Sequence, residues 1–238
     1  GFKNVEGTKI VVFFPDEGVS SIQRLQMCTQ EGSNVFVSAV NGNFDDAQTG
    51  VKSIFTNAEI LKKFEENNLV FSSANSINWG RLAPQIVYYV SAYCDLLTKG
   101  TLKMGEKMNV TVPTGNFGNI LAAYYAKMMG AKIGKFICAS NVNDVLARFV
   151  KTGVYDPGEK FTVTNSPSMD IRKSSNVERL LWLLNDGDGA EVERLMNDLA
   201  VKGRYELNDK YKEQLEAAGM KCVGINPETK VVEGVEVA

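Results

Sequence analysis

The 238-residue sequence contains no histidine. Within these residues this absence excludes histidine-ligated zinc sites, serine–histidine–aspartate triads and cysteine–histidine pairs. Any chemistry that the chain carries out must therefore depend on a cofactor, on lysine and carboxylate side chains, or on backbone dipoles. We predict no metal site.

Cysteine is scarce, and Cys28, Cys94, Cys138 and Cys222 are too far apart to form a C-x-x-C pair. This spacing favours buried, reduced thiols in a cytoplasmic protein. No apolar run approaches the roughly 20 residues needed to cross a bilayer, and no secretory signal is visible. The net charge is −2, and no strongly basic patch suggests nucleic acid as a partner. We expect neither a membrane nor a nucleic acid as partner.

Apolar runs alternate with segments of helical period, which predicts an α/β fold with a mainly parallel, twisted sheet and helices on both faces. Strands are predicted over residues 9–14, 34–40, 69–72, 108–112 and 135–139. Helices are predicted over residues 22–29, 46–55, 58–66, 82–98, 121–128, 144–151, 176–184, 191–200 and 208–217. The order of elements suggests two subdomains, residues 1–67 and 68–238.

The most informative stretch is residues 110–126, VTVPTGNFGNILAAYYA, in which a β-prone segment leads through a glycine loop into a helix. The loop consists of Gly115, Asn116, Phe117, Gly118 and Asn119. The first N–H groups of a helix lack internal partners and the helix dipole adds positive charge, so this loop can hold a phosphate. Glycine permits positive φ and close approach of an anion. The alternative is a plain connection without ligand, since the spacing matches neither the dinucleotide fingerprint nor the P-loop.

A second polar loop, residues 73–81, follows the predicted strand 69–72. Its candidate binding residues are Asn75, Ser76, Asn78 and Arg81. Arg81 could bind an anionic group through two hydrogen bonds, or the loop could only cap helix 82–98 and leave Arg81 solvated. Ligands of parallel sheets bind beyond the carboxyl ends of strands. The loops after strands 69–72, 108–112 and 135–139 are therefore predicted to meet in one region.

These loops together resemble one family, the threonine synthases of the fungal and enterobacterial type. The similar stretches are NGNFDDAQ (41–48), SSANSINWGR (72–81), PTGNFGN (113–119), SPSMDI (166–171) and SNVER (175–179). The resemblance runs across nearly the whole chain. It implies a pyridoxal-phosphate lyase of fold type II, the tryptophan-synthase-β-like fold, present here in incomplete form. Members convert O-phospho-L-homoserine and water into L-threonine and phosphate.

By position, the resemblance implies that residues 115–119 hold the phosphate of pyridoxal 5'-phosphate, in agreement with the reading of the loop itself. It also implies that Asn75, Ser76, Asn78 and Arg81 meet the substrate's phosphate or carboxylate. Asn176 is expected nearby, without an assigned role.

The family's Schiff-base lysine lies in a Ser-Phe-Lys-Asp segment that this sequence does not contain, and its Ser-Gly-Asp-Thr-Gly loop and C-terminal portion are also missing. Lys3 is predicted instead to be a surface lysine at the end of a helix. We therefore expect a central fragment that is inactive alone and that self-associates through exposed apolar edges. Two other hypotheses stay open: a non-catalytic paralogue that binds a phosphorylated ligand, and a generic α/β transferase.

Overall fold

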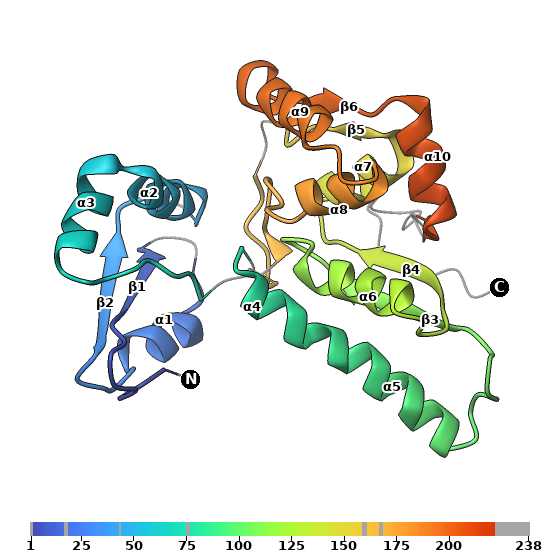
Figure 1. The fold of residues 1–238 in the computed structure, drawn as a ribbon, viewed down its shortest axis with the longest axis horizontal. Helices are drawn as coiled ribbons and strands as arrows, with labels where there is room; N and C mark the ends of the chain where they lie inside the picture. Colours follow the sequence, from blue (N-terminus) through green and yellow to red (C-terminus); the bar gives the residue numbers. More distant parts are fainter. Residues whose placement is uncertain are drawn as a thin grey trace. The chain divides into compact units, whose positions relative to one another are not determined.

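The computed structural model describes residues 2–16, 19–42, 44–74, 77–158, 161–166 and 169–221. They fall into two compact units that divide between Ser72 and Ser73, a few residues after the boundary that we placed at residue 67. Each unit is described by itself (Figure 1).

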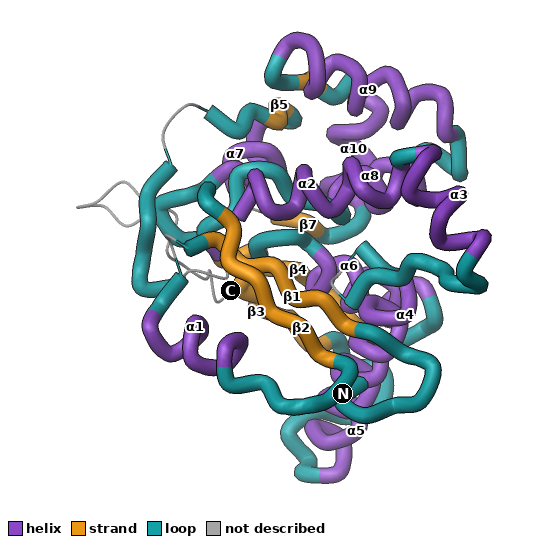
Figure 2. The backbone as a smooth tube through the Cα atoms, turned by 90° about the vertical axis from the view of Figure 1, so that its left-hand side faces the viewer, coloured by secondary structure: helices purple, strands orange, loops and turns teal. Residues whose placement is uncertain are grey.

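The first unit is built on a parallel pair of strands. β1 (Ile10–Pro15) pairs with β2 (Val35–Val40), and both strands lie where the apolar runs predict them (Figure 2). The helices of this unit are α1 (Ser21–Cys28), α2 (Phe44–Thr56) and α3 (Ala58–Glu66). Ser20 caps α1 in a capping box with Gln23, which satisfies donors that the first turn leaves free.

The strand predicted at residues 69–72 is not formed. Val70 is 92% exposed, and Phe71 packs on helix side chains, with its ring centroid 4.9 Å from that of Phe55 and 3.9 Å from that of Phe64. A short β-prone run becomes a strand only where a neighbour can pair with it. The prediction was wrong, and the polar loop that begins at residue 73 does not follow a strand.

Two smaller predictions are corrected in part. Residues 2–9 form turns and irregular structure instead of a helix end, although Lys3 does lie at the surface, with its Nζ 2.9 Å from Glu31 Oε2. Cys28, Cys94 and Cys138 are free thiols, but only Cys138 is buried. Cys222 lies outside the described residues. Cysteine spacing carries no information about which face of a helix meets the core, so the prediction of burial was wrong for Cys28 and Cys94.

The second unit carries a parallel sheet and an antiparallel strand pair. β3 (Met108–Pro113), β4 (Ile133–Ala139) and β7 (Met220–Lys221) are parallel, with β4 in the middle. β5 (Val154–Tyr155) pairs antiparallel with β6 (Tyr205–Glu206). The predicted mainly parallel α/β fold is therefore confirmed, but the two-residue strands were not predicted because they are too short to leave a pattern.

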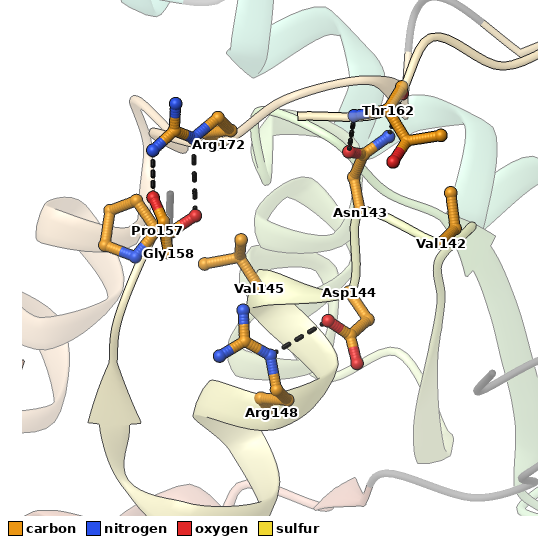
Figure 3. Close-up of a pocket in the computed structure, with 9 residues that line it drawn as sticks. All are labelled: Val142, Asn143, Asp144, Val145, Arg148, Pro157, Gly158, Thr162 and Arg172. Atoms are coloured by element: carbon orange, nitrogen blue, oxygen red, sulfur yellow. Dashed lines mark hydrogen bonds and ion pairs between the residues drawn. The ribbon is translucent and has the colours of Figure 1, made fainter. Parts of the chain in front are cut away.

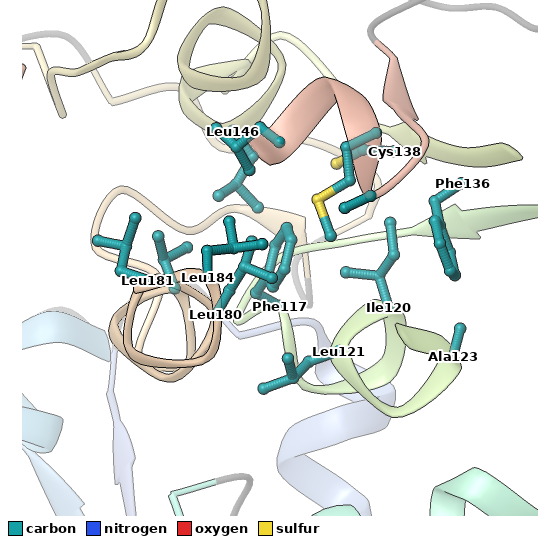
Figure 4. Close-up of a cluster of buried hydrophobic side chains, with 14 of the residues drawn as sticks. Phe117, Ile120, Leu121, Ala123, Phe136, Cys138, Leu146, Leu180, Leu181 and Leu184 are labelled. Atoms are coloured by element: carbon teal, nitrogen blue, oxygen red, sulfur yellow. The ribbon is translucent and has the colours of Figure 1, made fainter. Parts of the chain in front are cut away.

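The second unit also contains helices, of which three pack on the parallel sheet: those over residues 118–128, 145–152 and 209–217. In chain order, its described helices are α4 (Trp79–Leu82), a 3-10 turn (Ala83–Gln85), α5 (Ile86–Thr98), α6 (Gly118–Met128), α7 (Val145–Thr152), α8 (Val177–Leu184), α9 (Gly189–Lys202) and α10 (Asp209–Ala217). In Figure 4, Ile120 and Ala123 of α6 lie on one side of β4, and Leu146 of α7 lies on the other. No helix in the described part of the chain is both long and apolar enough to cross a membrane.

Helix α6 lies at the centre of the core of this unit. Ile120, Leu121, Ala122, Ala123 and Ala126 are each at most 1% exposed. Burial of one leucine or isoleucine side chain contributes about 1.5–3 kcal/mol. The position of α6 is therefore fixed by packing along its length, from its first turn onward.

Candidate anion site at the start of a buried helix

The loop between β3 and α6 is anchored at its first residue. Thr114 N donates to Ala139 O at 3.0 Å, and Thr114 Oγ1 donates to Val112 O at 2.8 Å. The buried Thr114 is thus bound to the ends of two neighbouring strands. This places the following glycine loop at the carboxyl edge of the parallel sheet, where α/β proteins bind their ligands.

The left-handed residue of this loop is Phe117, the N-cap of α6, with φ 65° and ψ 2°. The sequence pointed to the glycines for this conformation, but neither Gly115 nor Gly118 is among the residues with positive φ. A side chain with a Cβ is disfavoured there by about 1–2 kcal/mol. The Phe117 ring is 1% exposed and packs in the core with Leu121 and Leu180 nearby (Figure 4), and this burial offsets the backbone cost.

The start of α6 offers several unpaired donors; Asn119 Oδ1 accepts from Ile120 N at 2.9 Å and from none of the preceding N–H groups. In the described chain, no acceptor pairs with the backbone N–H groups of Gly115, Asn116, Phe117, Gly118 and Asn119. The helix has no side-chain cap and no acidic residue in its first turn. Unpaired N–H groups and the positive end of the helix dipole suit a phosphate or another oxyanion. The donor set therefore fits the phosphate of a cofactor.

The far side of the loop is held by the residues just before α8. Asn176 N and Nδ2 both donate to Asn116 O, at 3.2 and 2.9 Å. Ser175 N and Oγ both lie within hydrogen-bond distance of Asn116 Oδ1, at 3.3 and 3.2 Å. Arg179 Nη1 donates to Asn176 Oδ1 at 2.6 Å. Residues distant in sequence thus fix both the main chain and the side chain of Asn116.

The closing residue of the loop, Asn119, is fixed from two directions. Asn119 Nδ2 donates to Pro113 O at 2.8 Å, and its main-chain carbonyl accepts from Tyr89 Oη at 2.8 Å. Burial raises the pKa of the Tyr89 hydroxyl. Tyr89 therefore stays protonated and remains a donor to the loop throughout the neutral pH range.

The loop before α4 is only partly described, because Asn75 and Ser76 lie outside the described residues. Asn78 caps α4: its Oδ1 accepts from Gly80 N at 2.8 Å, and its Nδ2 donates to Ser73 O at 2.6 Å. The capping alternative therefore accounts for the Asn78 side chain. Arg81 is exposed and makes no ion pair within the described chain.

Arg179 brings this loop close to the glycine loop. Its Nη2 donates to Ile77 O, and its Nη1 binds Asn176, which in turn holds Asn116. The Trp79 ring also meets the Tyr125 ring of α6 edge to face, with centroids 5.1 Å apart. The two predicted loops therefore lie close together, joined through the first turn of α8.

The segment after β4 is tied to residues 161–171 by a buried carboxylate. Asp170 Oδ1 accepts from Asn141 Nδ2 at 2.6 Å, from Asn143 Nδ2 at 3.0 Å and from Thr164 Oγ1 at 2.8 Å. Asp170 Oδ2 accepts from Thr164 N at 2.8 Å. Ser140 Oγ, at the end of β4, is buried without a partner in the described chain. The third predicted loop is thus a polar, cross-linked segment.

A cavity of about 240 Å³ opens beside this segment, between the start of α7 and the residues Pro157, Gly158, Thr162 and Arg172 (Figure 3). Its two guanidinium groups already have protein partners. Arg148 Nε pairs with Asp144 Oδ1 at 2.9 Å, and Arg172 donates to the carbonyls of Pro157 and Gly158. No residue of the glycine loop lines this cavity, so it is separate from the candidate anion site.

Four residues that support the loop were not singled out for these contacts by the sequence: Tyr89, Thr114, Asn176 and Arg179. Asn176 and Arg179 do lie in the SNVER stretch that resembles the threonine synthases. Their hydrogen bonds join residues 60 and 102 positions apart along the chain. Such pairings leave no local pattern, so the resemblance was the only available signal.

Comparisons with known proteins give a consistent result. A crystal structure of pyridoxal-phosphate-bound threonine synthase from Brucella melitensis superposes with a TM-score of 0.76 and 38% identity, over 92% of this chain and 45% of that one. The crystal structure of yeast threonine synthase gives a TM-score of 0.76 and 36% identity, over 93% of this chain and 43% of that one. Human threonine synthase-like 1 is 47% identical over 209 residues, which are 87% of this chain and 28% of that protein.

No family model matches the chain. The chain spans less than half of each of these relatives. The similarity nevertheless covers both units and is accompanied by a shared fold. The comparisons therefore confirm the resemblance that the five stretches of sequence suggested, and with it the α/β fold of that family.

Proposed function

We propose that this chain, related in sequence and fold to a part of the threonine synthases, forms the phosphate-binding part of a pyridoxal-phosphate lyase. The proposed reaction converts O-phospho-L-homoserine and water into L-threonine and phosphate. The observation that carries the proposal is the set of unpaired N–H groups from Gly115 to Asn119 at an uncapped helix start. A related synthase binds pyridoxal phosphate.

In this proposal each part of the site has a separate task. The N–H groups of residues 115–119 hold the cofactor phosphate, and the dipole of α6 adds to the attraction. The cofactor, when bound, supplies an electron sink for bonds at the substrate α-carbon. Arg81, exposed and free of ion pairs in the described chain, binds the substrate phosphate or carboxylate. Asn75 and Ser76 assist it, while Asn78 keeps their loop in shape.

Binding of the cofactor phosphate is tested with probes that lack an aldehyde, so that surface lysines cannot react with them. Pyridoxine 5'-phosphate and pyridoxine differ only in the phosphate. We expect the 238-residue chain to bind the phosphorylated probe at least about tenfold more tightly, because an ionic hydrogen bond contributes roughly 1.5–3 kcal/mol. Inorganic phosphate should compete. Equal affinity for both probes, measured by calorimetry, would contradict the proposal.

Turnover depends on more than this chain contains. The 238 residues include no Ser-Phe-Lys-Asp segment, and the cofactor chemistry of the family needs that lysine. We expect no phosphate release from O-phosphohomoserine by this polypeptide alone. Release above background in a coupled phosphate assay would refute this expectation.

The second candidate function is a non-catalytic protein that uses the same loop to bind a phosphorylated ligand. It is kept because the chain is 47% identical to human threonine synthase-like 1 and 38% and 36% identical to the two solved synthases. The two candidate functions can be distinguished with a longer protein, one that contains this chain and matches those relatives in length. Turnover of O-phosphohomoserine supports the lyase, whereas tight binding of pyridoxine 5'-phosphate without turnover supports the ligand-binding paralogue.

Self-association is the remaining part of the proposal. In the described part of the first unit, only Phe14 and Pro15 are buried, whereas Val11, Phe13 and Phe36 are exposed on uncharged strands. Unprotected strand edges tend to pair with another chain. We expect light scattering to give a dimer or larger species, and Val11→Lys to reduce it. A monomeric wild-type chain would contradict this part.

A further inference from the structure

We infer that Asn176 is a positioning residue for the anion site: it sets the orientation of the peptide group between Asn116 and Phe117. This inference rests on the proposed function, because it assigns a task in holding the cofactor phosphate. Asn176 is fully buried, and two of its donors, N and Nδ2, converge on Asn116 O. A single carbonyl thus has both of its acceptor positions occupied by one residue.

Because of the geometry of the peptide bond, the contact between Asn176 and Asn116 O also sets the direction of the Phe117 N–H. In a trans peptide the carbonyl and the following N–H point in opposite directions, and the described chain contains no cis peptide bond. With Asn116 O held against Asn176, the N–H of Phe117 must point away from the start of α8. Phe117 N–H is one of the unpaired donors of the loop.

The backbone of Phe117 shows why this orientation needs support. Its φ of 65° lies in the left-handed region, which disfavours residues that carry a Cβ. Rotation of the peptide group between Asn116 and Phe117 would return φ to negative values and would turn the N–H away from its present direction. The bonds from Asn176 oppose this relaxation, so they maintain the donor in the direction that the anion site requires.

The side chain of Asn176 is oriented by a neighbouring residue, and it does not cap its own helix as asparagine at this position often does. Asn176 is the N-cap of α8 but makes no side-chain cap bond, whereas Asn57 and Asn208 do cap α3 and α10. Arg179 Nη1 donates to Asn176 Oδ1 at 2.6 Å. Because Arg179 can only donate, the oxygen faces Arg179 and the NH₂ group faces Asn116. An aspartate could not donate in this position.

The test compares Asn176→Ser with Asn197→Ser in the full 238-residue chain. Asn197 is exposed on α9 and serves as the matched control. Asn176→Ser removes the Nδ2 donor without adding charge. We expect its affinity for pyridoxine 5'-phosphate to fall about three- to tenfold, the usual range for one hydrogen bond, with unchanged affinity for pyridoxine. Asn197→Ser should change neither affinity.

If Asn176→Ser folds poorly, the role of Asn176 can be tested by a second variant and a second measurement. Asn176→Asp keeps the shape and the Arg179 contact but replaces the donor that faces Asn116. Selective amide NMR of the wild-type chain should show the Phe117 N–H signal moving downfield on addition of pyridoxine 5'-phosphate, and this shift should be lost in Asn176→Asp. Equal losses for both probes, or an unchanged Phe117 shift, would overturn the inference. If the wild-type chain does not prefer the phosphorylated probe, the proposed function itself fails.

Discussion

The starts of α6 and α9 are opposite solutions to the same problem of unpaired N–H groups. At α9, Asp188 Oδ1 accepts from Ala190 N at 2.9 Å, and Glu191 adds negative charge in the first turn. At α6 the N-cap is Phe117, which offers no acceptor, and no acidic residue follows. A hydrogen-bonded cap is worth about 1 kcal/mol. The start of α6 lacks the stabilisation that such a cap would provide.

This difference separates a helix start that only stabilises the fold from one that is kept available for a ligand. At α9 the terminus is held by its own cap. At α6 it is held by the buried Phe117 ring and by bonds to Asn116 and Asn119. Burial and side contacts keep the loop in place while its N–H groups stay unpaired. The following predictions test this division of tasks.

The largest effect is expected for Phe117→Ala. Loss of a buried phenylalanine costs about 3–5 kcal/mol, and Phe117 is 1% exposed. The free energy of unfolding, measured with urea, should therefore fall by several kcal/mol. Phe117→Leu keeps most of the buried volume and should cost less than about 1.5 kcal/mol. A loss below 1 kcal/mol for Phe117→Ala would show that the ring does not anchor this helix start.

Much of the frame around this helix was predictable from local sequence. The β-prone residues of 108–112, the glycine loop and the helical spacing of Leu121 and Tyr125 placed β3, the loop and α6 correctly. Residues 69–72 were also predicted to be a strand but form none. The difference is a partner: β3 pairs with β4, whereas no strand in the described chain pairs with residues 69–72. Local sequence does not reveal such pairing.

The details of the site were less predictable. The sequence indicated a donor-rich loop, but it assigned the backbone freedom to the glycines, whereas Phe117 has the positive φ. A phenylalanine is favoured there only because the core accepts its ring. The bonds from Asn176 and Arg179 join segments far apart in sequence. Conformations that depend on tertiary packing and long-range hydrogen bonds cannot be derived from local propensity.

A smaller effect is expected for Asp188→Ala. It removes the cap of α9 and should lower the free energy of unfolding by about 1 kcal/mol. Because the start of α9 is bound by its own cap and not by a ligand, the loss in free energy of unfolding should be the same with and without pyridoxine 5'-phosphate. Urea unfolding under both conditions measures this. A loss that changes when the ligand is added would mean that the two helix starts are not independent.

The smallest effect concerns Tyr211, which reports the negative charge at the start of α9. Burial, with additional effects of Glu191 and Asp188, raises the pKa of Tyr211 to about 12, and its hydroxyl is buried without a partner in the described chain. An unfolded tyrosine has a pKa near 10. Between about pH 10 and 12 the unfolded chain loses this proton and the folded chain keeps it, so stability falls as the pH rises through this window.

Asp188→Asn isolates the charge, because asparagine caps a helix as well as aspartate. The stability at pH 7 should therefore stay nearly unchanged, while the pKa of Tyr211 moves down by roughly a few tenths of a unit, as for a partly screened charge. The phenolate absorbance of the folded chain, with Tyr211→Phe subtracted, measures the shift. Burial is the only cause of the raised pKa of Tyr89 beside α6, so its titration should not move. A matching shift at Tyr89 would show that the negative charge of α9 extends to the start of α6, where it would repel an anion.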